Sequence, residues 1–273
     1  MFSSKLTRAL GLIPALLAAA LLSQFLPGCS VIEDRDDCPS VLILDLDQVR
    51  RDSVAAGGLL LLVHGESLEF ADTLASDEIP QVYRLALPRL ERLVLDLYPL
   101  QLSENIDLSG IAIDQGAQCP EVWSYDETFS SMGESVKLKA CLHKNFCDLT
   151  IALVSADGKT RWPFSMAIGG SVSGYEFGGA SRRGDFRVRM RPDSSNHCFV
   201  RVPRQLDNSL VLEVRGEEGA LRTFALGEYL GESGYDWTAP DLEDAFIEVN
   251  YSATSITFKI DAWSRTISYE TVI

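Results

Sequence analysis

Apolar and polar residues alternate with a period of two in several separate segments, and this period is typical of β-strands with one buried face. The clearest segments are residues 42–46, 93–97, 136–142, 149–153, 186–190, 210–214 and 256–262. Alternation favours antiparallel sheets, because strands of parallel sheets are usually apolar on both faces. Helical periodicity is confined to residues 224–230 and 241–246, each long enough for a turn or two. The pattern predicts an all-β protein built from antiparallel β-sandwiches.

The strands fall into two groups, with a soft boundary near Ala140. We expect an N-terminal β-sandwich over residues 38–139 and a C-terminal β-sandwich over residues 140–273. The dipeptides Asp157-Gly158, Gly169-Gly170 and Gly178-Gly179 predict turns in the second group, because glycine is the commonest residue of tight turns. No internal repeat is visible along the chain.

The first residues are typical of a secretory signal. Lys5 and Arg8 precede an apolar run over residues 10–26, which is short for a membrane-spanning helix. The run ends in Leu26-Pro27-Gly28-Cys29, which resembles a bacterial lipobox, although Pro27 departs from the usual small residue. We therefore predict a lipoprotein signal peptide over residues 1–28. The Cys29 thiol would carry diacylglycerol and its freed amine an acyl chain, and several chains hold a protein firmly to a membrane. The alternative is an ordinary signal peptide with a chance cysteine.

The net charge of the chain limits the classes of partner that it can bind. The 273 residues include 24 Lys and Arg against 39 Asp and Glu, a formal net charge of −15. Such a chain repels a phosphate backbone and anionic lipid headgroups, so we predict no nucleic-acid binding and no basic membrane patch. Residues 29–37 are rich in acids and read as a solvated tether. They also resemble the acidic export signal of Bacteroidetes lipoproteins, which implies a position at the outer surface of the cell.

Five cysteines follow Cys29, and an exported chain can oxidise them. Cys147 and Cys198 share the parity of neighbouring apolar residues and should both point inward, so we favour a Cys147–Cys198 disulfide. Cys38 and Cys119 each precede a proline and form the second candidate pair, with Cys141 left over or as an alternative partner. A metal site formed by cysteines and histidines of this region is disfavoured, because its cysteines lack short Cys-x-x-Cys spacing and two of its neighbouring residues face opposite sides of a strand. That set comprises Cys141, His143, Cys147, His197 and Cys198.

No catalytic motif is present among the three histidines and the many carboxylates, so we predict a protein that is not an enzyme and needs no cofactor. Arg183-Gly184-Asp185 has the sequence of an integrin-type tripeptide, but a tight turn ahead of the next strand explains its glycine. Arg187, Arg189 and Arg191 form a basic stripe on one strand face. We interpret it as a solvated face with local ion pairs, and the alternative is a docking stripe for an acidic partner.

The chain as a whole resembles the FimB/Mfa-type fimbrial anchor lipoproteins of the Bacteroidales. The resemblance rests on Gly28-Cys29 with its acidic spacer and Cys38-Pro39, and is most specific from Val202 to Trp263. Its motifs there are Val202-Pro203-Arg204-Gln205, Leu226-Gly227-Glu228-Tyr229-Leu230, Gly234-Tyr235-Asp236-Trp237 and Asp241-Leu242-Glu243-Asp244. The resemblance implies two transthyretin-like sandwiches in tandem, attached to the outer membrane through Cys29.

The implied function is to hold the base of a fimbria and to limit its length. Fimbrillin subunits would be the partners, joined by strand addition, in which an extended segment completes the open sheet of a neighbour. The C-terminal strands at Ile256–Trp263 or Thr266–Ile273 are candidates for that edge.

Two other functions stay open. A surface glycan-binding lipoprotein would present exposed aromatic residues, with candidates Trp123, Tyr125, Trp162, Tyr175, Tyr235 and Trp237. A secreted enzyme on a sandwich scaffold is the third reading, which the lack of a catalytic motif disfavours.

Overall fold

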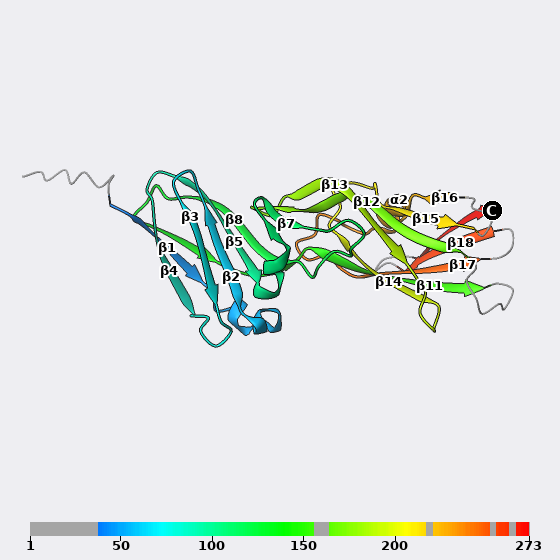
Figure 1. Ribbon diagram of the computed structural model, residues 1–273, viewed down its shortest axis with the longest axis horizontal. Helices are drawn as coiled ribbons and strands as arrows, with labels where there is room; N and C mark the ends of the chain where they lie inside the picture. The colour runs from blue at the N-terminus through cyan, green and yellow to red at the C-terminus, as the bar shows by residue number, and fades with distance from the viewer. Residues whose placement is uncertain (1–37, 156–163, 217–220, 252–254, 262–265, 273) are drawn as a thin grey trace, which may run out of the picture. The chain divides into compact units, whose positions relative to one another are not determined.

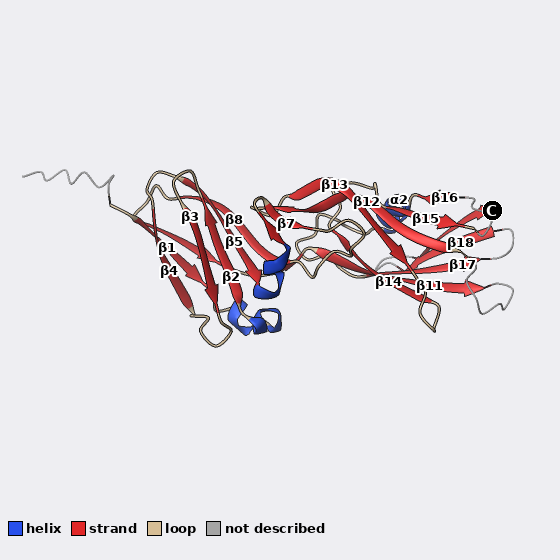
Figure 2. Ribbon diagram, viewed as in Figure 1, coloured by secondary structure: helices blue, strands red, loops and turns tan. Residues whose placement is uncertain are grey.

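Strands dominate the structure, which confirms the all-β prediction (Figure 2). The computed structural model describes residues 38–155, 164–216, 221–251, 255–261 and 266–272 (Figure 1). The predicted signal peptide, Cys29, the acidic tether and Trp162 lie outside these residues. Within them, no helix is both long and apolar enough to cross a bilayer.

The N-terminal sandwich is formed by two sheets, with strand orders β4-β1-β9 and β10-β8-β5-β2-β3. Their alternating leucines, such as Leu44 on β1 and Leu95 on β5, are fully buried between the sheets. Each such burial stabilises the fold by about 1.5–3 kcal/mol. The elements are β1 (Ser40–Asp45), η1 (Val49–Arg51), η2 (Ser53–Gly57), β2 (Leu59–His64), β3 (Glu69–Leu74), β4 (Val82–Leu87), β5 (Arg92–Pro99), η3 (Leu100–Asn105), β8 (Trp123–Ser130), β9 (Ser135–Lys139) and β10 (His143–Lys144).

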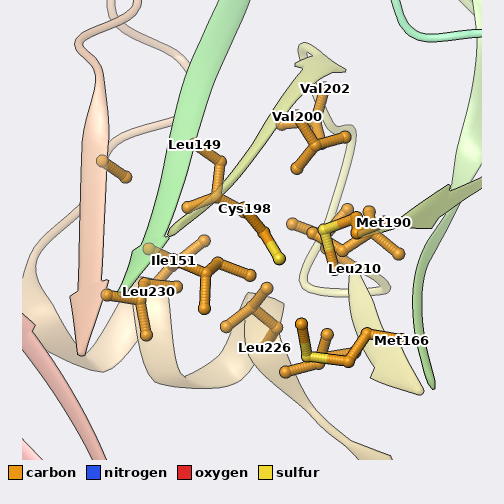
Figure 3. Close-up of a cluster of buried hydrophobic side chains, with 14 of the residues drawn as sticks. Leu149, Ile151, Met166, Met190, Cys198, Val200, Val202, Leu210, Leu226 and Leu230 are labelled. Atoms are coloured by element: carbon orange, nitrogen blue, oxygen red, sulfur yellow. The ribbon is translucent and has the colours of Figure 1, made fainter. Parts of the chain in front are cut away.

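The C-terminal sandwich packs a sheet of order β14-β11-β17-β18-β19 against a sheet of order β16-β15-β12-β7-β6, with β13 paired to β12. Its core contains Ile151, Cys198 and Leu210, and α2 contributes Leu226 and Leu230 (Figure 3). The elements are β6 (Ile106–Asp107), β7 (Gly110–Ala112), β11 (Phe146–Ser155), β12 (Ser165–Glu176), β13 (Ser181–Met190), β14 (His197–Pro203), β15 (Val211–Arg215), β16 (Leu221–Phe224), α2 (Leu226–Ser233), β17 (Ala245–Tyr251), β18 (Ser255–Asp261) and β19 (Thr266–Val272).

Among the described strands, each sandwich contains one parallel pair in an otherwise antiparallel arrangement. β1 pairs in parallel with β9, and β11 pairs in parallel with β17. Parallel neighbours need a long crossover rather than a hairpin, so β1 and β11 each join a strand that comes much later in the chain.

Three local predictions were wrong, and two were confirmed. The turn at Gly178-Gly179 lies between β12 and β13, as predicted, whereas Asp157-Gly158 lies outside the described residues. Gly169-Gly170 lies inside β12, the strand at the centre of its sheet, and is not a turn. Residues 241–244 form no helix, because β17 begins directly after them at Ala245. Arg183-Gly184-Asp185 lies inside β13, where a Cβ at position 184 would be 2.1 Å from the Ser173 hydroxyl oxygen, so close packing rather than a turn requires the glycine. The helical segment near residues 224–230 is confirmed as α2.

A short hairpin from the N-terminal half joins the C-terminal sandwich. β6 and β7, over residues 106–112, extend the sheet of β12 through Glu176 and Gly110. A third apolar cluster, with Tyr98, Ile111 and Tyr175 among its members, lies between the two larger cores. Both sandwiches belong to the one compact unit Pro39–Ile273, and the boundary near Ala140 stays a prediction.

Candidate functional site

A hydrogen-bonded seam joins the end of β10 to the loops after β14 and α2. We call it the Arg204 clamp. The Arg204 guanidinium donates to the carbonyl oxygens of Trp237 at 2.6 Å, Ala239 at 2.7 Å and Pro240 at 2.9 Å, and to the Asn145 side chain at 3.0 Å. Because a guanidinium offers five donors in a fixed planar fork, one side chain satisfies several loop carbonyls. The clamp holds loop 237–240 in place beside residues 144–145.

The hydroxyl of Tyr175 completes the clamp from β12. It donates to the carbonyl oxygen of Asn145 and accepts from the backbone N–H of Arg204 at 2.8 Å. Burial raises the pKa of Tyr175, so the phenol stays neutral and remains a donor. The sequence motif Val202-Pro203-Arg204-Gln205 is therefore anchored by hydrogen bonds, a role that the alternation pattern does not reveal.

A buried carboxylate lies where the β12–β13 turn meets β5. Asp96 is fully buried and accepts from the backbone N–H of Gly178 at 2.8 Å and from the Tyr98 hydroxyl at 3.1 Å. Its second oxygen has no hydrogen-bond partner among the described residues. Burial raises the pKa of Asp96 to about 6, since desolvation outweighs the hydrogen bonds that favour the charged form.

The described cysteines are all free thiols, and the Cys147–Cys198 prediction was wrong. Both side chains are fully buried in one core, as their parity predicts. The strand register, however, places Cys147 opposite Val202 and Cys198 opposite Ile151. This separates the two cysteines by four residues along the strands, or about 14 Å, which exceeds the roughly 7 Å limit between bridged Cα atoms. Parity fixes the face of a residue but not its register.

The Cys38–Cys119 pair is also absent. Cys38 is exposed ahead of β1, whereas Cys119 is buried and its backbone N–H donates to the Arg201 carbonyl oxygen at 3.1 Å. Cys141 is half-buried at the end of β9, where Gln48 donates to its sulfur at 3.0 Å.

We expect the thiols to differ sharply in reactivity. Burial raises the pKa values of Cys147 and Cys198 to about 11, so at neutral pH the reactive thiolate is scarce. Alkylation of the native chain at pH 7.5, followed by mass spectrometry, should modify Cys38 first and leave Cys147 and Cys198 intact until denaturant is added. Complete native labelling of the two buried thiols would contradict their placement in the core.

The residues weighed as metal ligands lie in different environments. His143 contacts Asp241 with a nitrogen–oxygen distance of 3.3 Å, Cys147 and Cys198 point into the core, and His197 stacks on Phe199 on the outer face of β14. In the described part of the chain, no three His, Cys, Asp or Glu side chains gather as a metal site.

Most aromatic residues considered for glycan binding are core residues. Tyr125, Tyr175 and Trp237 are buried, and Trp123 and Tyr235 are partly buried against the apolar clusters. Among the residues whose exposure the structure describes, the exposed aromatic side chains are Phe199 on β14 and Phe246 on β17. Both sit opposite Thr150 in the register, one on each side of β11. The alternation that buries Cys198 and Val200 places Phe199 on the outer face, so the exposure of Phe199 could have been predicted from the sequence.

The basic stripe is located on an edge strand. β13 pairs only with β12 among the described strands. Its residues Arg187 and Arg189 are exposed, and so is Arg191, which follows directly after the strand ends at Met190. Arg187 forms an ion pair with Glu213 of β15, across β12. A groove of about 530 Å³ runs between these two strands.

The two C-terminal strands differ in their availability for strand addition. β18 pairs with β17 on one side and β19 on the other, whereas β19 pairs only with β18 within the described residues. Of the two candidate segments, the edge position therefore belongs to Thr266–Val272.

Neither the protein-family models nor the curated protein sequences match this chain. Several solved structures do match it. The fimbrial anchor protein Mfa2 from Porphyromonas gingivalis aligns with a TM-score of 0.58 and 10% identity, over 83% of this chain and 98% of that one. A "putative adhesin" from Bacteroides ovatus gives 0.54 and 11%, over 85% and 95%. A structure from Bacteroides thetaiotaomicron described as "putative polysaccharide binding proteins" gives 0.53 and 11%, over 84% and 98%.

These similarities extend along almost the whole described chain, so both sandwiches take part in them. At such low identity they define the fold and leave the activity open. The chain therefore has the all-β fold of the Mfa2 fimbrial anchor and of adhesin-type structures from Bacteroides.

Proposed function

We propose that this protein is a lipid-anchored subunit at the cell surface that holds the base of a fimbria. The observation that carries the proposal is the combination of a lipobox-like Gly28-Cys29 with a fold that covers 98% of a fimbrial anchor protein. The role is a binding role without catalysis. Acyl chains on Cys29 would hold the chain in the outer membrane, with the acidic residues 29–37 as a spacer.

The contact with fimbrillin subunits would use an open sheet edge. In strand addition, backbone hydrogen bonds supply affinity and pockets for alternate side chains supply specificity. The C-terminal edge strand β19 is our candidate for this contact. A subunit tied to lipid can join the polymer at one end only, so its incorporation would stop growth and limit fimbrial length.

Replacing the acylated cysteine tests the anchor. In the native bacterium, Cys29→Ala should release fimbriae into the medium and allow them to lengthen, measured by electron microscopy and by the fimbrillin content of cell-free supernatant. Cys38→Ala is the matched control, because Cys38 is an exposed thiol nearby that lies outside the lipobox. Attached fimbriae of normal length in the Cys29→Ala strain would reject the proposal.

Glycan binding is the second candidate, because one observation favours it. Phe199 and Phe246 are exposed in one row of the outer face of the β11 sheet, with the small side chain of Thr150 between them. A flat row of this kind suits the apolar face of a sugar ring. A glycan array with the Phe199→Ala and Phe246→Ala variants distinguishes this function from the anchor.

A further inference from the structure

The outer face of the β12 sheet contains a groove with a floor of small residues. Ser165, Ala167 and Gly169 of β12 share this face, because they alternate with the core residues Met166 and Ile168. The register places β13 arginines on one side of this floor and β15 residues on the other. Arg189 and Glu213 flank Ala167, Arg187 and Val211 flank Gly169, and Arg215 flanks Ser165.

The walls of the groove carry positive charge in a strongly acidic chain. Arg187, Arg189, Arg191 and Arg215 all line it, although the whole chain has a net charge of −15. Arg189 and Arg191 are exposed and have no ion-pair partner among the described residues. Arg187 already binds a carboxylate, that of Glu213. The groove therefore attracts anions, and its own geometry includes one carboxylate bound across the floor.

The dimensions of the groove favour an extended polypeptide. Its walls stand two strand spacings apart, or about 9.6 Å, which is too narrow for a helix of about 10–12 Å diameter. Arg187 and Arg189 are two residues apart on β13, a spacing of about 6.8 Å, and Arg191 follows directly after the strand ends. Alternate side chains of an extended peptide have the same spacing. Carboxylates at every second position can thus face successive arginines, in the manner of cross-strand pairs.

We propose that this groove binds an extended acidic segment of a partner polypeptide, with carboxylates at alternating positions facing Arg187, Arg189 and Arg191. In the free chain the Glu213 carboxylate is paired with Arg187, and a carboxylate of the partner displaces it on binding. The inference rests on the proposed function only for the identity of the partner, a neighbouring fimbrial subunit. The groove itself needs neither Cys29 nor the polymer.

Two labelled peptides test the chemistry on the purified, detergent-solubilised chain. One alternates three glutamates with threonines, and the other has the same composition with its glutamates contiguous. Fluorescence anisotropy should show tighter binding of the alternating peptide, with affinity that falls as salt increases. Arg189→Glu combined with Arg191→Glu should weaken this binding at least about tenfold, since each reversal removes an attraction and adds a repulsion.

Three further variants separate local recognition from general charge. Arg84→Glu with Arg92→Glu makes the same charge change on exposed strand positions of the other sandwich, and should leave binding within about twofold. Ala167→Ile fills the floor without changing charge, and should reduce binding. Glu213→Gln removes the competing carboxylate, and should tighten it a few-fold. Thermal melts confirm that each variant is folded.

The results that overturn the proposal are equally specific. Equal affinity for the two peptides would show that binding does not depend on the match between glutamate and arginine spacing. An equal loss of affinity in the Arg84→Glu, Arg92→Glu control would show that the effect comes from net charge and not from the groove. Binding of a heparin fragment without binding of either peptide would assign the groove to an anionic glycan instead. Failure of the Cys29→Ala experiment would leave these outcomes untouched, so the two proposals fail separately.

Discussion

Replacing Arg204 with alanine is expected to lower the free energy of unfolding by at least about 3 kcal/mol. The side chain donates to three loop carbonyls and one side-chain oxygen at 2.6–3.0 Å. Charge-assisted hydrogen bonds contribute about 1.5–3 kcal/mol each, and acceptors left without partners add a desolvation cost. The sum is reduced because Arg204 is half-buried and water can replace some of the bonds. Chemical denaturation with far-UV circular dichroism measures the change.

Two controls make this result specific. Arg204→Lys should recover little stability, because an ammonium group cannot reproduce the planar fork that reaches several carbonyls at once. Arg183→Ala should change stability by less than about 0.5 kcal/mol, as expected for an exposed side chain. A loss of less than 1 kcal/mol in Arg204→Ala would show that the loop at 237–240 holds its position without the clamp.

The second large effect concerns the buried carboxylate of Asp96, and its sign is opposite. At pH 7.5 we expect Asp96→Asn to stabilise the protein by up to about 3 kcal/mol, because the native pKa of about 6 makes ionisation of this group costly. The amide oxygen of asparagine can still accept from the Gly178 backbone. The gain in unfolding free energy is smaller than this upper value if the new amide N–H groups of asparagine find no acceptors.

The pH dependence identifies the cause. In the unfolded chain an aspartate has a pKa near 3.9, and in the native protein Asp96 has a pKa of about 6. The native state therefore binds the proton more tightly, and stability from this group is full below pH 4 and lost as pH rises to about 6. The difference in unfolding free energy between Asp96→Asn and wild type should grow over this window. Asp77→Asn, at an exposed position, should show no such growth, and a flat difference for Asp96→Asn would contradict the assignment.

The fold class could be predicted from the sequence because alternation reports burial directly. Each alternating segment forms a strand or overlaps one, and the inward positions Cys147, Leu149 and Cys198 are buried as parity requires. The resemblance to fimbrial anchors also led to the correct fold. Both signals are local or motif-based, and neither needs knowledge of which strands are neighbours.

The remaining features depend on contacts between distant residues. The disulfide prediction failed on register, since two inward cysteines on paired strands can still lie four residues apart. β12 escaped detection because its glycines resemble turn residues. Gly174 has a φ of 152°, and a Cβ there would be 2.1 Å from the Ile111 carbonyl oxygen, so the glycine allows β7 to approach. Such a need arises only after β7 and β12 have met.

The clamp and the groove were hidden for the same reason. Nothing around Arg204 in the sequence shows that loop 237–240 returns to it. The stripe Arg187, Arg189 and Arg191 is visible in the sequence, but the sequence alone favours a solvated face over a docking surface. What favours docking is the small floor of β12 and the opposite wall of β15, which belong to segments far along the chain.

The parallel pairing of β1 with β9 has a consequence for biogenesis. β1 ends at Asp45, yet its partner β9 spans Ser135–Lys139, so about ninety residues must follow β1 before the two strands can pair. High contact order of this kind slows folding and leaves strand edges open to self-association. A chain synthesised from its N-terminus exposes β1 throughout that interval. Chaperones that shield apolar strands should therefore govern how much folded protein accumulates.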